Sequence, residues 1–310
     1  MRLKPPCRSS FVQTLRFWGR GIFSFCTTTV LFAEAQRQPH GAPALTTTVV
    51  DTIDPLAGAE SFVYRDGALE PMRLYVFKPA GWSSRDRRAA FVFFFGGGWT
   101  HGTPERSAMW GKFAASLGMV GIVPDYRTKE RFNTSPLAAV ADGRAALHWV
   151  QSHAEGLGLA SDTIIVGGDS SGGHVALWTT ITENPPGSIA SEAPRDKPAA
   201  LILFSAVSDT SLQTGYTPFR FADNATALSP WHQLDKKMPP ILAFHGDADR
   251  TVPFRQAVAL SDKLKATGNQ CELVVVPGGD HGFLKEMPQW RDRSQEIIRE
   301  FLIKQGLLAP

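Results

Sequence analysis

The sequence contains little cysteine and no strong excess of charge of either sign. Of its three cysteines, Cys7 and Cys26 lie within the first 35 residues, so only Cys271 belongs to the rest of the chain. Beyond residue 35 the chain holds 27 of the 32 basic residues and 28 of the 29 acidic residues, which leaves a net charge of −1. A lone cysteine cannot form an intrachain disulfide, and a chain without a basic patch is not expected to bind nucleic acid.

Long apolar runs are absent after the N-terminal segment. Residues 1–35 combine five basic side chains, an apolar stretch at 21–33 and the small-residue pattern Ala33-Glu34-Ala35. This order predicts a secretory signal peptide over residues 1–35. Its apolar core is too short to span a bilayer stably, so we expect a secreted or periplasmic protein with no stable membrane anchor after cleavage; an uncleaved anchor is the alternative. Residues 36–60 are expected to form a loose N-terminal leader.

The sequence also lacks the two common nucleotide-binding patterns, G-x-x-x-x-G-K-[ST] and G-x-G-x-x-G. We therefore predict no nucleotide site, and nothing in the chain predicts another cofactor or a metal. After an expected N-terminal hairpin, apolar runs of strand length alternate with segments of helical periodicity. That alternation predicts one α/β domain over residues 61–310, with a mostly parallel central sheet and helices on both faces. The expected strands are 61–65, 72–78, 89–95, 119–123, 163–166, 200–204, 241–244 and 272–276, and the expected helices are 103–118, 135–150, 174–182, 254–267 and 288–305.

One segment, residues 208–240, departs from this alternation. It lies between two expected strands and is longer than an ordinary connection. Its aromatic residues Tyr216, Phe219, Phe221 and Trp231 stand among polar ones. Loops at the carboxyl ends of parallel strands are where such folds bind ligands, so we interpret the segment as a small cap over a binding site. An irregular loop is the alternative.

The heptapeptide 167–173, Gly-Gly-Asp-Ser-Ser-Gly-Gly, lies between an expected strand and an expected helix. Glycines at 168 and 172 leave room for a tight turn that presents Ser170 above the sheet edge, the G-x-S-x-G pattern of a nucleophile elbow. Asp169 stands where a pattern centred on Ser171 would need glycine. Ser170 is therefore the predicted nucleophile. A glycine- and serine-rich surface loop is the alternative.

A serine hydroxyl becomes a good nucleophile only when a base takes its proton, and that base is usually a histidine held by a carboxylate. His281 fits this role because it follows an expected strand in the glycine-rich turn 277–283 and comes after Ser170 in the chain. The other histidines lie on helices or before the acid candidates. His281 is the predicted base.

The acid should lie between the nucleophile and the base, after another strand. Segment 245–253 offers two candidates, Asp247 and Asp249. Asp209, which follows the preceding expected strand, is a weaker third candidate. The turn position slightly favours Asp249 but leaves the choice open.

A carbonyl under attack needs hydrogen-bond donors for the oxyanion that forms. Three consecutive glycines follow the expected strand 89–95, and their backbone N–H groups can approach a ligand with no side chain in the way. One predicted donor is the N–H of Gly97 or Gly98, and the other is the N–H of Ser171. A flexible turn at a strand end is the alternative.

These motifs together resemble those of the α/β-hydrolase superfamily. Within it they are similar to the esterases that include bacterial acetyl-xylan and feruloyl esterase-like enzymes and the hormone-sensitive-lipase-like group. The resemblance covers residues 61–308, and it implies Ser170 as nucleophile, Asp249 as acid and His281 as base. The motifs that carry it are, in chain order, 95–99, 124–127, 168–173, 246–253 and 280–283.

The sequence departs from this family pattern at two places. Many relatives have histidine where this chain has Phe95, so the hydrogen bonds of that histidine to the oxyanion loop are missing here. The acidic residue usual after the segment 125–127 is not clearly placed either. Asp125 and Arg127 match a structural motif of the family, and we interpret them as a buried polar brace.

The resemblance implies a serine carboxylesterase without metal or organic cofactor. Its expected substrates are short-chain esters, above all acetyl esters, on a small molecule or on an oligosaccharide from plant polysaccharide. Trp99 and Trp231 are the candidate substrate-binding residues, because an indole ring can stack on a sugar. A peptidase or amidase, a feruloyl esterase and an inactive hydrolase-fold binding protein are the alternatives. The sequence predicts no particular oligomeric state.

Overall fold

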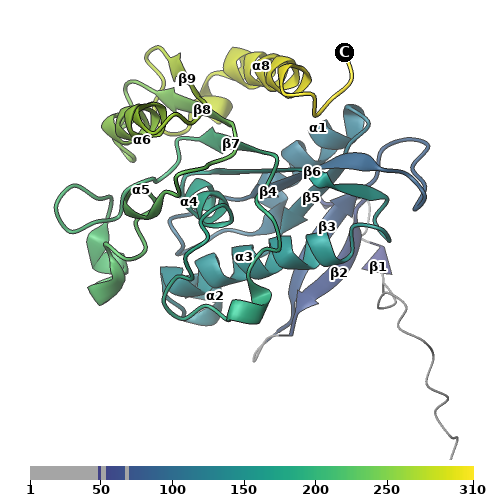
Figure 1. Cartoon of the computed structure of the whole chain (residues 1–310), viewed down its shortest axis with the longest axis horizontal. Helices are drawn as coiled ribbons and strands as arrows, with labels where there is room; N and C mark the ends of the chain where they lie inside the picture. The colour runs from purple at the N-terminus through teal and green to yellow at the C-terminus, as the bar shows by residue number, and fades with distance from the viewer. Residues whose placement is uncertain (1–47, 50–53, 67–69) are drawn as a thin grey trace, which may run out of the picture. The chain divides into compact units, whose positions relative to one another are not determined.

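The computed structural model describes residues 48–49, 54–66 and 70–310 of the chain (Figure 1). The expected signal peptide 1–35 lies outside the described residues, and so does most of the expected leader. Within the described ranges, no helix combines the length and the apolar character needed to cross a membrane.

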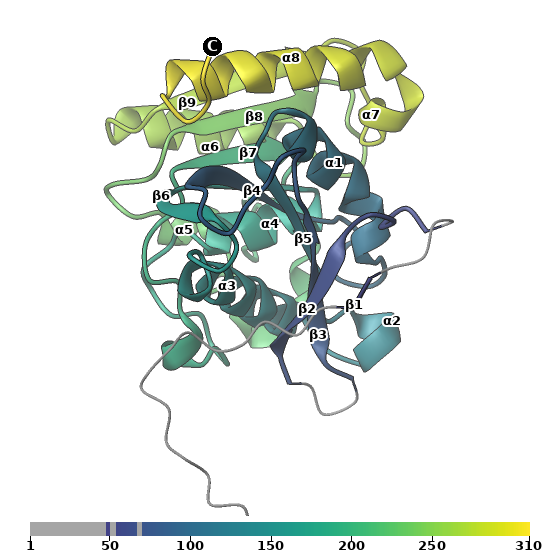
Figure 2. The same cartoon turned by 90° about the vertical axis from the view of Figure 1, so that its right-hand side faces the viewer.

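A nine-stranded sheet forms the centre of the described part of the chain (Figures 1 and 2). Its strands lie in the order β1-β2-β3-β5-β4-β6-β7-β8-β9. The first three pairings in this order are antiparallel and the remaining five are parallel, which confirms the expected mostly parallel sheet. The strands are β1 Thr48–Val49, β2 Glu60–Arg65, β3 Met72–Phe77, β4 Arg88–Phe94, β5 Val120–Pro124, β6 Leu159–Asp169, β7 Ala200–Phe204, β8 Ile241–Gly246 and β9 Cys271–Val276.

Helices cover both faces of the sheet, as expected. The side chains of β4 alternate between two apolar cores, with Phe91 and Phe93 on one face and Val92 and Phe94 on the other. Helices α1 and α8 bury the first face, and α3, α4 and α6 bury the second (Figure 2). Central strands covered on both sides need apolar residues at nearly every position. The helices are α1 Ala108–Ser116, α2 Lys129–Phe132, α3 Pro136–Ser152, α4 Ser171–Trp178, α5 Pro230–Gln233, α6 Arg255–Ala266, α7 Phe283–Glu286 and α8 Pro288–Lys304, with 3-10 turns η1 Pro104–Ser107, η2 Ala190–Glu192, η3 Pro218–Arg220 and η4 Ala222–Asn224.

Three differences from the expected elements have clear physical reasons. The expected helix 103–118 consists of the 3-10 turn η1 followed by α1. Helix α4 begins at Ser171 rather than His174, because the glycines of the heptapeptide continue directly into the helix. The four-residue helices α2, α5 and α7 were not expected, since one helical turn is too short to show a periodicity.

The α/β domain also begins earlier than the expected boundary at Ser61. Thr48–Val49 pair with β2, and Leu56 and Ala59 are buried in a small core with Phe77. The expected loose leader 36–60 is therefore wrong for these positions. Burial of Leu56 beside β3 gives this part of the leader a fixed place in the domain.

Candidate active site

Ser170 lies in the sharp turn between β6 and α4. Its backbone has φ 52° and ψ −119°, a conformation that a non-glycine residue rarely adopts. A Cβ on Gly168 would lie 2.3 Å from the carbonyl oxygen of Gly172, and a Cβ on Gly172 would lie 2.2 Å from that of Phe94. Both positions therefore require glycine, and the turn is built as a nucleophile elbow is.

The structure brings Ser170, His281 and Asp249 into one chain of hydrogen bonds. Nε2 of His281 lies 2.9 Å from Oγ of Ser170, and Nδ1 of His281 lies 2.8 Å from Oδ2 of Asp249. The three residues follow β6, β9 and β8, parallel strands whose carboxyl ends meet at one edge of the sheet. In such a chain the imidazole can accept the serine proton while the carboxylate orients the ring.

The alternative acids lie elsewhere. Asp247 is exposed, and its carboxylate accepts a hydrogen bond from the N–H of Gly278. The carboxylate of Asp209 accepts hydrogen bonds within its own segment, from the N–H of Ser211 and the hydroxyl of Ser229. Among the three candidates, only Asp249 contacts His281.

Asp249 is held as a carboxylate by three hydrogen-bond donors and by the neighbouring ring of His245. Burial by itself would raise the pKa of Asp249, but hydrogen bonds from His245 and His281 outweigh burial and hold that pKa well below its usual range. Oδ1 accepts from the N–H groups of Thr251 and Val252, each at 2.8 Å. Oδ2 lies 3.2 Å from Nε2 of the buried His245. Because Asp249 is ionised, Nδ1 of His281 carries the proton, which leaves Nε2 free to accept one from Ser170.

The glycine loop after β4 has the backbone needed to expose its N–H groups. Gly97, Gly98 and Trp99 have φ values of 151°, 61° and 59°. A Cβ on Gly97 would lie 1.8 Å from the carbonyl oxygen of His101, so glycine is required there. Across residues 54–66 and 70–310, no protein acceptor is found for the N–H of Gly97, Gly98 or Ser171. These three predicted donors are thus available to a ligand.

Phe95 stands where many relatives have a histidine, and it contacts its surroundings by stacking its ring on another aromatic ring. Its ring lies parallel to that of Tyr126, with 4.0 Å between centroids. The hydroxyl of Tyr126 donates to the carbonyl oxygen of Phe95 at 2.7 Å. Both side chains are fully buried. The start of the glycine loop is therefore fixed by packing and by one hydrogen bond from a side chain to its backbone.

The expected brace is present in the segment that follows β5. Asp125 forms an ion pair with Arg131, and Arg127 forms one with the fully buried Asp142 on α3. Asp142 also pairs with Arg65 on β2. These contacts tie the loop of Tyr126 to α3 and β2, which is a structural role.

Asp169 is a site residue that sequence reasoning missed. Its Oδ1 accepts a hydrogen bond of 2.9 Å from the N–H of Gly96, and a Cβ on Gly96 would lie 2.3 Å from Oδ2. Burial raises the pKa of Asp169 to about 6, although the Gly96 hydrogen bond opposes the rise. In the sequence, Asp169 excludes Ser171 as the nucleophile. Its place directly before Ser170 also indicates that it borders the site.

Asp169→Asn is expected to remove one pH-dependent contribution to the stability of the protein. Because folding raises the pKa of Asp169 from 3.8 to about 6, the folded wild type holds the proton of Asp169 more tightly than the unfolded chain between these values. The contribution of Asp169 to wild-type stability should therefore fall as pH rises through this window, by about 3 kcal/mol. Urea unfolding of both proteins at about pH 4 and about pH 8 measures the difference. Relative to wild type, the variant should have a higher free energy of unfolding at the higher pH than at the lower pH. The same difference in free energy of unfolding at both pH values would contradict this.

Two cavities meet at Ser170 and His281. One, of about 370 Å³, is bordered by the glycine loop, and the other, of about 500 Å³, reaches toward α7 and Arg291. Tyr216 and Arg220 from segment 208–240 line the smaller cavity. The segment contains the 3-10 turns η3 and η4 and the short helix α5, and its role as a cap stays a prediction.

The two predicted tryptophans do not line these cavities. Trp231 packs on α6, where its Nε1 donates to the carbonyl oxygen of Ala259 and its ring lies 4.0 Å from the ammonium of Lys263. The prediction of Trp231 as a substrate-binding residue is wrong, since these contacts hold its ring on α6 and it lines neither cavity at Ser170. Trp99 is 2% exposed and borders a third cavity, described below.

Metal ligands are not clustered in the described residues. In the ranges 54–66 and 70–310, no group of three or more His, Cys, Asp or Glu side chains is arranged to hold a metal ion. The acidic and histidine side chains of the site are instead used in the hydrogen-bonded chain described above.

Known families and proteins resemble the chain over the same region. A family model described as alpha/beta hydrolase fold matches residues 91–229, and the model BD-FAE matches residues 205–264. The chain is 35% identical to the propionate-bound thermophilic esterase of Thermogutta terrifontis, with a TM-score of 0.75, covering 82% of this chain and 97% of that one. It is 27% identical to ethyl acetate hydrolase of Pseudomonas putida, covering 81% of this chain and 83% of the relative.

The likeness to mycobacterial relatives covers less of each protein. The chain is 30% identical to the probable carboxylic ester hydrolase LipM of Mycobacterium tuberculosis over 56% of its own length. It covers 44% of LipM and 52% of esterase LipC, about half the length of these curated relatives. The fold, the elbow at Ser170 and the match to the Thermogutta esterase agree, and the chain belongs to the α/β-hydrolase family, among its carboxylic ester hydrolases.

Proposed function

We propose that the protein is a serine carboxylesterase that hydrolyses short-chain esters through an acyl-enzyme. The observation that carries this proposal is the hydrogen-bonded chain from Ser170 through His281 to Asp249 where two cavities meet. The N–H groups of Gly97, Gly98 and Ser171 supply the donors that acyl transfer needs beside such a chain. Relatives named as esterases support the same class of reaction.

In the first half of the proposed reaction, Oγ of Ser170 attacks the carbonyl carbon of the ester as Nε2 of His281 takes its proton. The carbonyl oxygen becomes an oxyanion, which the N–H of Ser171 and one of the glycine N–H groups stabilise. The imidazolium of His281 is stabilised by the carboxylate of Asp249 at 2.8 Å. His281 then protonates the leaving alcohol, and the carbon–oxygen bond to the alcohol breaks.

In the second half, water replaces the alcohol. His281 takes a proton from this water, whose oxygen attacks the carbonyl carbon of the acyl-enzyme. The bond between Ser170 Oγ and the acyl carbon breaks, and His281 returns its proton to the serine. The carboxylic acid leaves and the free enzyme is restored.

The proposed substrates are acetyl and other short acyl esters. The cavities of about 370 and 500 Å³ at Ser170 are of modest size. One relative is named ethyl acetate hydrolase, and the Thermogutta esterase has been solved with propionate and with butyrate. Acetylated fragments of plant polysaccharide are the proposed natural source of such esters, which the expected export of the protein favours.

Export is itself part of the proposal. It rests on the basic, apolar and small-residue order of residues 1–35. A protein recovered from the periplasm or medium with Gln36 at its N-terminus supports it, whereas the full chain retained in the membrane fraction would contradict it.

The acyl preference is tested with 4-nitrophenyl esters from acetyl to dodecanoyl. We expect kcat/KM to be highest for acetyl to butyryl and to fall by on the order of 10²-fold for dodecanoyl, as the short-chain proposal requires. Acetylated xylan, assayed by acetate release, tests the polysaccharide source. A maximum at the dodecanoyl ester would overturn the short-chain proposal.

A further inference from the structure

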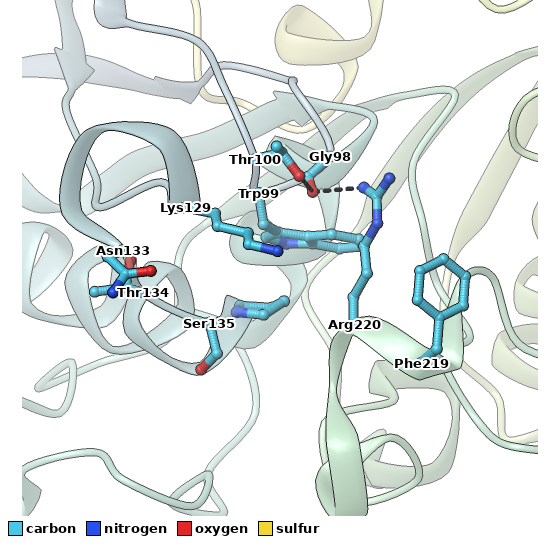
Figure 3. A pocket seen from close by; sticks show the side chains of 10 residues that line it. Gly98, Trp99, Thr100, Lys129, Asn133, Thr134, Ser135, Phe219 and Arg220 are labelled. Atoms are coloured by element: carbon cyan, nitrogen blue, oxygen red, sulfur yellow. Dashed lines mark hydrogen bonds between the residues drawn. The ribbon is translucent and has the colours of Figure 1, made fainter.

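A third cavity, of about 530 Å³, is bordered by Gly98 and Trp99 of the glycine loop (Figure 3). It shares Gly98, Thr100 and Arg220 with the smaller cavity at Ser170, so the two are neighbours. The loop after β4, helix α2, the start of α3 and segment 208–240 form its walls. Its lining residues are Gly98, Trp99, Thr100, Lys129, Asn133, Thr134, Ser135, Pro136, Phe219 and Arg220.

The walls of this cavity carry positive charge only. Lys129 and Arg220 are the charged residues of the lining, which contains no aspartate or glutamate. In the part of the chain that the structure describes, neither cation forms an ion pair with a carboxylate. Opposed cations without a protein counter-ion create a positive potential in a concave site.

Two buried polar atoms of the wall also have no protein partner among the described residues. They are Nε1 of Trp99, a donor, and Oγ1 of Thr134. Trp99 is 2% exposed, so its indole N–H is shielded from bulk water. A buried donor without an acceptor costs about 1–3 kcal/mol.

The guanidinium of Arg220 donates one hydrogen bond to the protein and has further donors available to a ligand. Its Nη1 donates to the carbonyl oxygen of Gly98 at 2.8 Å (Figure 3). Nε and Nη2 donate to no other group in the described ranges. A guanidinium with two free donors suits the two oxygens of a carboxylate.

We propose that this cavity binds a carboxylate carried by the ester substrate, remote from the scissile bond. The inference rests on the proposed esterase function and narrows its substrates to short esters with an anionic end. The reacting carbonyl lies at Ser170, and the anion lies between Lys129 and Arg220. Phe219, which is 78% exposed, adds an apolar surface to the lining of this cavity.

The subsite is connected directly to the oxyanion loop. The N–H of Lys129 donates to the carbonyl oxygen of Trp99, and the N–H of Glu130 donates to that of Thr100. Arg220 holds the Gly98 peptide from the other side. An anion bound here contacts residues that fix the loop, so its binding energy orients the substrate at Ser170.

The test uses two pairs of esters that differ only in charge. The first pair is 4-nitrophenyl hydrogen glutarate and its neutral primary amide, with the anion on the acyl side. The second pair is 4-carboxyphenyl acetate and 4-carbamoylphenyl acetate, with the anion on the alcohol side. For each pair the measured quantity is the charge preference, the ratio of kcat/KM for the carboxylate to that for the amide.

The variants are Lys129→Met and Lys129→Glu, with Lys265→Met on the exposed side of α6 as the matched control. We expect the charge preference for one pair to fall about fivefold in Lys129→Met and about twentyfold in Lys129→Glu, mainly through KM. It should be unchanged in Lys265→Met. Arg220 is a less clear probe, because its substitution would also release Gly98.

The outcomes separate the two proposals. The carboxylate subsite is overturned if, for each of the two ester pairs, the charge preference is the same in wild type, Lys129→Met and Lys129→Glu. Comparison with Ser170→Ala on the neutral amides tests the esterase itself: if that variant cleaves them as fast as wild type, the proposed function has failed. Serine-dependent cleavage without any effect of Lys129 overturns the subsite alone.

Discussion

Replacing Ser170 with alanine is expected to lower kcat for 4-nitrophenyl acetate by on the order of 10⁶-fold. The alanine removes the side-chain oxygen of residue 170, which lies 2.9 Å from Nε2 of His281 at the turn between β6 and α4. The oxyanion donors and the cavities remain, so a residual rate above that of water should persist. Stopped assays at high enzyme concentration measure it.

Ser171→Ala is the matched control for this variant. Ser171 is fully buried, and its hydroxyl lies 3.5 Å from the hydroxyl of Tyr126, away from the hydrogen-bonded chain. Its proposed contribution is its backbone N–H, which alanine keeps. The loss in kcat should therefore stay within about tenfold. A fluorophosphonate probe should label wild type and Ser171→Ala at Ser170, and labelling at another residue, or full activity of Ser170→Ala, would refute the proposed nucleophile.

Asp249→Asn is expected to lower kcat by about 10⁴-fold. Oδ1 of residue 249 is fixed by the N–H groups of Thr251 and Val252, so the amide NH₂ of the asparagine must take the place of Oδ2. An NH₂ group there faces Nδ1 of His281, which then cannot carry its proton. The proton moves to Nε2, where it points at Ser170 and blocks general-base catalysis.

Asp247→Asn is the control, because it changes the same group two residues earlier. Its carboxylate contacts the N–H of Gly278 on the surface, and an amide oxygen can accept that hydrogen bond equally well. Its kcat should remain within about twofold of wild type. Circular dichroism and urea unfolding check that both variants fold. A similar loss in both would mean that the turn 246–253 matters as a whole and would contradict the assigned role of Asp249.

Sequence reasoning identified the hydrogen-bonded chain because its parts have local signatures. The turn at Ser170 demands glycine at 168 and 172, and a Cβ at either position would collide with backbone. His281 and Asp249 follow strands that can be recognised from apolar runs alone. Parallel strands place their carboxyl ends together, so order in the chain predicts neighbours in space.

Sequence reasoning failed where a role depends on which way a side chain faces. Trp231 and Phe219 stand in the same aromatic segment, yet Trp231 packs on α6 and Phe219 lies at the rim of a cavity. His245 is one of the histidines that precede the acid candidates, and the structure places its Nε2 3.2 Å from Oδ2 of Asp249. Such contacts join residues of unrelated spacing, and no period or motif encodes them.

The sequence by itself determined the α/β architecture and the elbow, and it singled out Ser170 and His281 as the predicted nucleophile and base, because each follows from local backbone geometry and from strand order. Only the tertiary structure decided between Asp247 and Asp249, between the candidate aromatic residues, and how the glycine loop is held without a histidine at Phe95. It also brought Lys129 and Arg220 to one cavity. These outcomes depend on distances between segments, which packing fixes and the order of residues does not.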